Sequence, residues 1–306
     1  MRIIVTGGAG FLGAHIHRVL LDESYEVKVI DNLSRGFRDN VDPRASFEQL
    51  DLADQDKITK ALEGYEAVIH LANYLVVPES VEKPVEYAEN NVVNTVKLME
   101  AMKDAGVKKI VFSSSATVYG DNKNLPLTED TPLGVQANQY GASKIAMEAF
   151  ISTYHSLYNF DVTHLRYFNP YGPFEKHAPE THAIPNFIKA ALKKEEIPLY
   201  WKGEQIRDFI YAQDLAEAHT SVLDLKGLNI FNVGSETGIK VIDVVKLIFD
   251  IVGYEVPTRD LGKRVGDVPA NYASSKKLTQ TTGWKAKTSL REGLVKTIEY
   301  FRENLT

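Results

Sequence analysis

The hydrophobic pattern of the chain alternates between short apolar runs and longer segments in which apolar residues recur with helical spacing. Short apolar runs bounded by polar or turn residues predict buried strands. The predicted strands span residues 2–5, 27–30, 46–50, 67–71, 109–112, 162–167, 207–211 and 229–233. One predicted helix runs to residue 21, and the others span residues 85–105, 138–158, 185–194, 214–225, 242–252, 275–281 and 290–304. This alternation predicts an α/β protein with a doubly wound parallel sheet, in which function lies at the carboxyl ends of the strands.

The regular alternation of predicted strands and helices stops after residue 169. Residues 170–185 contain prolines, two histidines and mixed charge, which is typical of a long ordered loop near a site. His177 and His182 have neither helical spacing nor a third ligand, so the sequence predicts no metal site. We expect a nucleotide-binding domain over residues 1–168, to which the chain returns at about 207–234, and a smaller α/β substrate-binding lobe over residues 169–306.

Composition narrows the classes of partner. The chain has 306 residues and a net charge of −6, so it offers no basic footprint for nucleic acid or for an anionic membrane. No apolar run is nearly as long as a membrane-spanning helix, which needs about 20 residues. Strand-like sequence begins at Arg2 and leaves no room for a signal peptide, and the absence of cysteine removes disulfides, thiolate metal ligands and cysteine nucleophiles. We therefore expect a soluble, cytoplasmic protein that binds neither nucleic acid nor membranes.

Three glycines follow the first predicted strand. Gly7, Gly10 and Gly13 permit a tight turn, a close approach of the backbone to a pyrophosphate and close packing of helix against strand. The helix N-terminus then offers free N–H groups to phosphates. The second predicted strand ends in Asp31, which can accept hydrogen bonds from both hydroxyls of an adenosine ribose and would repel a 2′-phosphate. This order is that of a Rossmann dinucleotide-binding unit and predicts NAD as cofactor, although Arg35 and Arg38 leave NADP open.

A candidate catalytic pair lies in the helix predicted over residues 138–158. Tyr140 and Lys144 are four residues apart, so a helix places both side chains on one face. An ammonium about 4 Å from the phenol could lower its pKa by about three units and bring it into the range of a general base. Taken alone, a Tyr-x-x-x-Lys pair is more often an exposed aromatic and a lysine on a solvated helix face. Three consecutive serines, 113–115, directly follow the buried strand predicted over residues 109–112, where hydroxyls suit hydrogen bonding to a substrate.

These motifs together resemble a known family. The Gly-x-x-Gly-x-x-Gly spacing with Tyr140 and Lys144 is similar to the extended short-chain dehydrogenase/reductase superfamily. Residues 112–120 (FSSSATVYG), 165–170 (LRYFNP) and 207–211 (RDFIY) resemble the NAD-dependent sugar-nucleotide epimerases, above all the UDP-glucose 4-epimerase family. The resemblance covers essentially the whole chain. It implies a 4-epimerase of UDP-hexoses that oxidises the sugar transiently at C4 and regenerates NAD⁺ in each turnover.

The resemblance also implies roles for individual residues. Tyr140 would be the base, Lys144 would lower its pKa and bind the nicotinamide ribose, and Ser115 would hold the sugar 4-hydroxyl and relay its proton. The implied cofactor residues are Gly7, Gly10, Phe11, Leu12, Gly13, Asp31, Asn32, Asp51, Leu52, Leu71, Ala72, Asn90, Ser115, Tyr140, Lys144 and Phe168. The implied substrate residues are Asn169 and Asn186 at the hexose and diphosphate, Tyr200 on the uracil, Arg207 and Arg264 at the phosphates, Asp267 at the uridine ribose, and Asn271 near the sugar.

The sequence departs from the family pattern at two places. After Ala72 the family often has a glycine and, two residues later, a lysine that contacts the cofactor, whereas this chain has Asn73, Tyr74 and Leu75. Cofactor retention is therefore open to question. Asn271 stands where some members have a bulky tyrosine that restricts the sugar 2-substituent. We expect the smaller side chain to admit an N-acetylated sugar.

Several alternatives remain at this stage. A dehydratase usually has an Asp-Glu pair next to the residue that corresponds to Ser115, and this pair is missing here, while a decarboxylase on the same fold and a UDP-glucuronate 4-epimerase stay open. A non-catalytic dinucleotide sensor could retain the glycine loop, but it has no reason to retain Ser115, Tyr140 and Lys144 together. Family resemblance further implies a homodimer in which the helices at 85–105 and 138–158 form a four-helix bundle with their copies.

Overall fold

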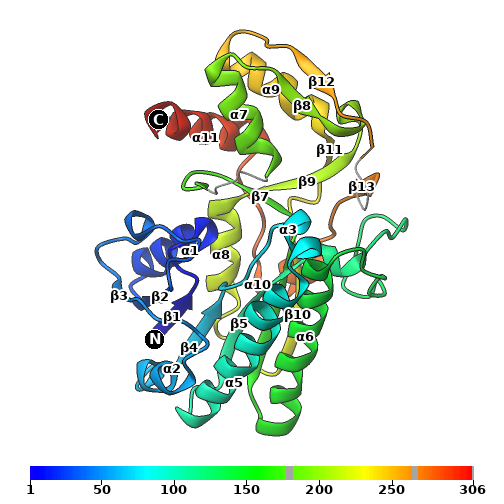
Figure 1. The fold of residues 1–306 in the computed structure, drawn as a ribbon. Coiled ribbons are helices and arrows are strands. Elements are labelled where there is room, and N and C mark those ends of the chain that lie inside the picture. The colour runs from blue at the N-terminus through cyan, green and yellow to red at the C-terminus, as the bar shows by residue number, and fades with distance from the viewer. Residues whose placement is uncertain (177–181, 264–267, 305–306) are drawn as a thin grey trace.

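A seven-stranded parallel sheet forms the larger lobe of the computed structural model, which describes residues 1–176, 182–263 and 268–304 (Figure 1). The strand order is β10-β6-β5-β4-β1-β2-β3. The strands are β1 (Arg2–Thr6), β2 (Glu26–Ile30), β3 (Ser46–Glu48), β4 (Ala67–His70), β5 (Lys109–Ser115), β6 (Asp161–Tyr167) and β10 (Leu228–Val233). Because every pair in this sheet is parallel, the carboxyl ends of the strands meet at one edge. The predicted doubly wound fold is confirmed.

Helices cover both faces of this sheet. The helices α1 (Phe11–Asp22) and α8 (Ala212–Ser221) pack on one face, and α2 (Gln55–Leu62), α5 (Asn94–Asp104) and α6 (Gln139–Tyr158) pack on the other. In β1, Ile3 and Val5 point into the first core and Ile4 points into the second, as the two-residue period of a strand requires. Burial on both faces explains why the strands read as continuous apolar runs.

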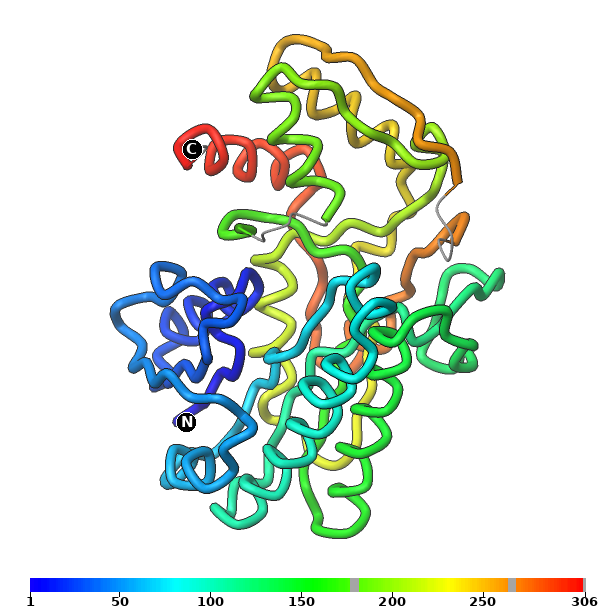
Figure 2. Tube along the Cα trace, viewed as in Figure 1, coloured from blue at the N-terminus to red at the C-terminus, as the bar shows by residue number. Residues whose placement is uncertain are grey.

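The smaller lobe contains two short sheets and three helices around a separate core. The strands β7 (Asn169–Tyr171), β9 (Ile206–Tyr211), β11 (Gly238–Lys240) and β13 (Ala270–Asn271) form one sheet, and β8 (Ile197–Leu199) pairs with β12 (Thr258–Asp260). The helices are α7 (Ala183–Lys193), α9 (Val241–Val252) and α11 (Leu290–Asn304). Figure 2 shows the trace passing back to the large lobe after β9. It returns through α8 and β10, while β9 itself stays in the small sheet. The division of the chain at residue 168 remains a prediction.

The segment before β5 is more irregular than the single helix that the sequence predicts over residues 85–105. It contains α3 (Val77–Glu82), α4 (Pro84–Tyr87), a π-helical segment (Ala88–Val93) and then α5. A π-helical turn often marks a functional site, because it rotates neighbouring side chains out of α-helical register. The remaining elements are α10 (Lys276–Thr282) and the 3-10 segments Arg38–Asn40, Ala116–Tyr119 and Tyr200–Gly203. Within the described ranges, no helix is both long and apolar enough to cross a membrane.

Candidate active site

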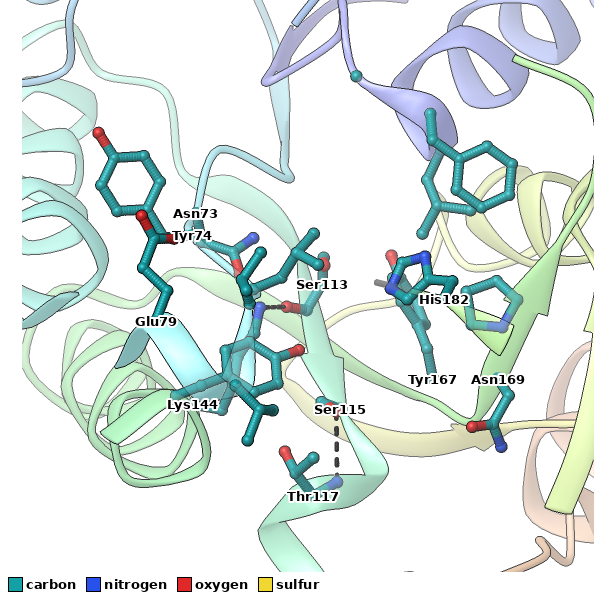
Figure 3. A pocket seen from close by; sticks show the side chains of 18 of the residues that line it. Asn73, Tyr74, Glu79, Ser113, Ser115, Thr117, Lys144, Tyr167, Asn169 and His182 are labelled. Atoms are coloured by element: carbon teal, nitrogen blue, oxygen red, sulfur yellow. Dashed lines mark hydrogen bonds between the residues drawn. The ribbon is translucent and has the colours of Figure 1, made fainter. Parts of the chain in front are cut away.

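A cleft with a volume of about 1660 Å³ is lined by residues of both lobes at the carboxyl ends of the parallel strands. A pocket for one drug-sized ligand has about 300–1,000 Å³, so this cleft has room for a dinucleotide and a second ligand together. Figure 3 shows Ser113, Ser115 and Lys144 near the middle of the cleft, with Tyr74 and Glu79 on one side and Asn169 and His182 on the other.

The glycine loop forms a cradle at one end of the cleft. Gly7 has φ +71°, and a Cβ there would lie 2.6 Å from the backbone nitrogen of Ala72. A Cβ on Gly13 would lie 2.5 Å from Cα of Gly8, so the loop and the start of α1 pack too closely for any side chain. Gly10 caps α1 with no side-chain hydrogen bond, and the first turn carries no acidic residue. The N-terminus of α1 therefore suits an anionic pyrophosphate.

Asp31 lies beside this cradle at the end of β2 and is 8% exposed. Its two carboxylate oxygens accept backbone N–H bonds from Ala9 (3.0 Å) and Leu33 (2.8 Å). Burial raises its pKa, and the two N–H bonds oppose that shift. Each oxygen keeps a free lone pair, so the carboxylate can accept further bonds from ribose hydroxyls. The dinucleotide that the sequence predicts would fit this site, which combines a glycine cradle, an open helix N-terminus and a buried carboxylate.

Ser115, Tyr140 and Lys144 come together in the cleft from two neighbouring elements. Ser115 is the last residue of β5, and Tyr140 and Lys144 lie one turn apart in α6, whose N-cap Asn138 accepts a bond from the N–H of Gly141 (2.9 Å). The Oγ of Ser115 accepts a bond from the backbone N–H of Thr117 (3.2 Å). Lys144 is 1% exposed, and its Nζ donates to the carbonyl of Ser113 (2.5 Å).

The protonation of this pair differs from the sequence-based expectation. Burial raises the pKa of the Tyr140 hydroxyl, and the Ser115 side chain only partly opposes that effect. Burial also lowers the pKa of Lys144 to about 7, against the attraction of Glu148. The Nζ of Lys144 lies 5.9 Å from the Tyr140 ring centroid and is directed to Ser113. In the protein alone, desolvation therefore outweighs the stabilising charge that the helical spacing suggested.

All of the predicted cofactor residues and most of the predicted substrate residues line the same cleft. The cofactor group consists of Gly7, Gly10, Phe11, Leu12, Gly13, Asp31, Asn32, Asp51, Leu52, Leu71, Ala72, Asn90, Ser115, Tyr140, Lys144 and Phe168. The substrate group consists of Asn169, Asn186, Tyr200, Arg207 and Asn271. Arg264 and Asp267 lie outside the described residues, as does His177. Among the described residues, no group of three or more side chains is arranged to hold a metal ion.

Two features of the site have no clear signal in the sequence. Asn91, in the π-helical segment, is fully buried and connects the wall of the cleft to α6. Its side chain accepts from the N–H of Tyr74 (2.7 Å) and donates to the carbonyl of Tyr74 (2.9 Å) and to Oγ of Ser143 (3.0 Å). Behind the catalytic group, Glu148 forms a buried bidentate pair with Arg166 (2.9 and 2.7 Å). These polar contacts fix α6 from both sides.

His70 has a structural place rather than a catalytic one. It is 1% exposed, and its two ring nitrogens bond to the hydroxyls of Thr6 (2.7 Å) and Thr95 (2.9 Å). His182 does line the cleft, where its Nδ1 contacts the buried carboxylate of Glu175.

The fold and the site define a nucleotide-dependent enzyme of the short-chain dehydrogenase/reductase class, with a glycine loop, a buried acid at the end of β2 and a Ser–Tyr–Lys group. The model of the NAD-dependent epimerase/dehydratase family matches residues 3–234. The chain belongs to this family, and its cofactor is NAD.

Individual relatives extend the similarity over the whole chain. The UDP-glucose 4-epimerase of Lactobacillus helveticus is 39% identical in an alignment of 308 positions that covers 94% of this chain and 92% of that protein. The crystal structure of a Thermotoga maritima UDP-glucose 4-epimerase with UDP-glucose is 34% identical, with a TM-score of 0.96 and full coverage of both chains. A UDP-N-acetylglucosamine 4-epimerase of Methanobrevibacter ruminantium, in complex with UDP-N-acetylmuramic acid, is 33% identical, with a TM-score of 0.93 over 99% of this chain and 98% of that chain.

Proposed function

We propose that the protein is an NAD-dependent 4-epimerase of UDP-hexoses, which interconverts UDP-glucose and UDP-galactose and accepts N-acetylated sugars. The observation that carries this proposal is the meeting of Ser115, Tyr140 and Lys144 in one cleft with the dinucleotide cradle. The similarity to UDP-glucose 4-epimerases over nearly the full chain supports the same reaction.

The proposed chemistry uses the three side chains in sequence. Tyr140, as phenolate, removes the proton of the sugar 4-hydroxyl, and the Ser115 hydroxyl holds that hydroxyl and relays the proton. Lys144 supplies the positive charge that favours the phenolate and holds the nicotinamide ribose. The bound NAD supplies reversible acceptance of the hydride from C4. Because C4 takes the hydride back on its other face and the 4-oxygen takes the proton back, the configuration at C4 is inverted and the reaction has no net redox change.

The other end of the cleft supplies groups that suit a UDP-sugar. Arg207 belongs to β9 and Tyr200 follows β8, and both line the cleft with Asn169 and Asn186. An arginine fork matches diphosphate oxygens, and an exposed aromatic ring offers a face on which a base can stack. We propose that Arg264 and Asp267 complete the nucleotide site from the same lobe.

The alternative functions share the fold but need other groups. A dehydratase requires an acid and a base next to the catalytic serine, where this chain has Ala116 and Thr117. Glu129 is held by the N–H of Asn232 (2.7 Å), and Asp121 is an exposed residue of the cleft lining. A UDP-glucuronate 4-epimerase or a decarboxylase would need donors for a sugar carboxylate that we do not assign. We therefore place the epimerase first.

The test is direct. Purified protein is incubated with UDP-galactose and, separately, with UDP-N-acetylgalactosamine, and the products are followed by proton NMR. Appearance of the 4-epimer without accumulation of NADH establishes the reaction, and the ratio of the two rates establishes the preferred sugar. A 4-keto-6-deoxy product, or net NADH with no epimer, would replace the epimerase by one of the alternatives.

We also propose that the protein is a cytoplasmic homodimer. A homodimer is supported by apolar side chains on the outer side of the paired helices, where Val85 is 66% exposed, Val93 47%, Phe150 46% and Leu157 68%. Exposed apolar side chains gathered on one pair of helices suit burial against a second copy. The cytoplasmic location is supported by the absence of cysteine, because a chain without cysteine can form no disulfides in an oxidising compartment.

A further inference from the structure

Two walls of the cleft face each other where the dinucleotide is expected to lie. One wall is the loop after β2, residues 31–37, and the other is the segment after β4, residues 71–79. The first wall contains Asp31, and the second contains Ala72, whose backbone packs against the glycine loop. Residues of both walls line the same cleft.

Side chains of the two walls are in direct contact across this entrance. Nη2 of Arg35 lies 2.6 Å from Oε2 of Glu79, and the guanidinium carbon lies 3.9 Å from the ring centroid of Tyr74. Glu79 also accepts a bond from Oη of Tyr87 (3.0 Å) and pairs with Lys83 (3.5 Å). Most surface ion pairs have two mobile partners and contribute little. Here the carboxylate is held in place by further partners, and the guanidinium lies over an aromatic face.

The wall that contains Tyr74 and Glu79 is anchored to the catalytic helix. Asn91 holds both the N–H and the carbonyl of Tyr74 and donates to Ser143, which lies between Tyr140 and Lys144 in sequence. On the other wall, Gly36 packs so closely on Asp31 that a Cβ there would lie 2.9 Å from both carboxylate oxygens. Arg35 therefore joins the ribose-binding acid of one wall to the catalytic helix through the other.

We propose that Arg35, Tyr74 and Glu79 form a clasp that closes the cleft over NAD and slows its release. The family lysine that would contact the cofactor is replaced in this chain by Leu75, and the clasp provides retention by another route. Opening requires loss of the ion pair and of the cation–π contact together. The inference rests on NAD binding and is independent of which sugar the enzyme accepts.

The test measures NAD release directly. The protein is loaded with NAD⁺, freed of excess cofactor by rapid desalting, and released NAD⁺ is converted at once to NADH by an excess of a coupling dehydrogenase. Glu79→Gln keeps the shape of the side chain but removes its charge, and Arg35→Gln removes the guanidinium. We expect each to release NAD about tenfold faster than the wild type. The double variant should release NAD no faster than the faster single variant, because one contact has been lost in all three.

Arg38 provides the matched control. It directly follows this loop, at the start of the 3-10 segment Arg38–Asn40, and its guanidinium stacks on Phe47 at 4.5 Å from the ring centroid. Arg38→Gln therefore removes one positive charge near the cleft without touching the clasp, and it should release NAD at the wild-type rate. Equal acceleration by Arg38→Gln, or wild-type release by both Arg35→Gln and Glu79→Gln, would overturn the clasp. Circular dichroism verifies folding, and Tyr74→Leu, which should also accelerate release, replaces any variant that fails to fold.

Discussion

At the scale of single residues, Tyr140 and Lys144 are so deeply buried that the charged form of either side chain is unfavourable in the protein without a ligand. Burial raises the pKa of Tyr140 and lowers the pKa of Lys144 to about 7, so desolvation favours the neutral form of both side chains. Bound NAD brings a positive charge on its nicotinamide ring to this region of the cleft. We infer that full activation of the tyrosine belongs to the complex and not to the protein alone.

Replacement of Tyr140 by phenylalanine tests its role as the base. Tyr140→Phe retains the ring and removes the hydroxyl, so we expect UDP-galactose turnover to fall by about 10²–10⁴-fold with the fold intact. Ser115→Ala should cause a smaller loss, because water can replace a relaying hydroxyl. Rates come from proton NMR, and bound NAD is measured in parallel as the control. A Tyr140→Phe enzyme that keeps a large part of the wild-type rate would assign the base elsewhere.

Asn271 determines the space beside the sugar in the proposed function. It lies in β13 in register with Arg207 of β9, lines the cleft, and has a buried Oδ1 atom with no hydrogen-bond partner among the described residues. Asn271→Tyr should suppress turnover of UDP-N-acetylglucosamine much more than turnover of UDP-glucose, because the larger ring occupies the space for the 2-substituent. Asn271→Ser is the control, because it replaces Asn271 without adding volume beside the sugar. An equal fall for both substrates would contradict the gate.

At the scale of elements, the sequence was most informative where burial is complete. Runs such as residues 3–5 and 67–69 are apolar at every position because both faces of the sheet are covered, and they lie within β1 and β4. The helix α2 was absent from the prediction because its apolar positions, Ile58, Ala61 and Leu62, span little more than one turn. The prediction also ended β5 at Phe112, whereas the strand continues through the three serines, whose polarity concealed it.

The sequence predicted more of the candidate site than of the structure that surrounds it. Gly7, Asp31, Ser115, Tyr140 and Lys144 are recognisable because their chemistry depends on spacing along the chain or on a strand end. The contact of Arg35 with Glu79 joins residues 44 positions apart through loops (79 − 35), which leave no periodic signal. The π-helical segment was likewise hidden, since its extra residue per turn depends on packing rather than on composition.

The exposed side of the helix pair supports a prediction about assembly. Phe150 is 46% exposed and Leu157 is 68% exposed on α6. If α6 and the preceding helices pair with a second copy, two charges on this surface would be buried in the interface. Phe150→Glu with Leu157→Glu should therefore yield a monomer by light scattering at micromolar concentration. Leu228→Glu, at a site 41% exposed on β10, is the control and should leave the wild-type mass unchanged. A monomeric mass for the wild-type protein would contradict the proposed homodimer.

At the scale of the whole molecule, buried histidines are concentrated in the lobe that contains the large sheet. Five of the eight histidines in the chain, His15, His17, His70, His164 and His219, are at most 5% exposed and lie on α1, β4, β6 and α8. Burial lowers the pKa of His70 to about 3 and of the other four to about 4. They are therefore neutral in the folded protein at pH values where the unfolded chain would bind protons.

This difference predicts acid sensitivity of the nucleotide-binding lobe. Because the folded pKa values lie below the unfolded value of about 6.5, their stabilising contribution is complete above that pH and is lost progressively as the pH falls toward 4. Each histidine with a pKa of about 4 accounts for up to roughly 3 kcal/mol. Urea unfolding at about pH 7.5, 6 and 5 should show the free energy of unfolding falling steeply below about pH 6.5. His219 accepts from Oη of Tyr167 and donates to the carbonyl of Leu215, so His219→Gln can retain hydrogen bonds without titrating. That variant should lose less stability than the wild type between about pH 6.5 and 5, whereas equal stability at about pH 7.5 and 5 would refute the prediction.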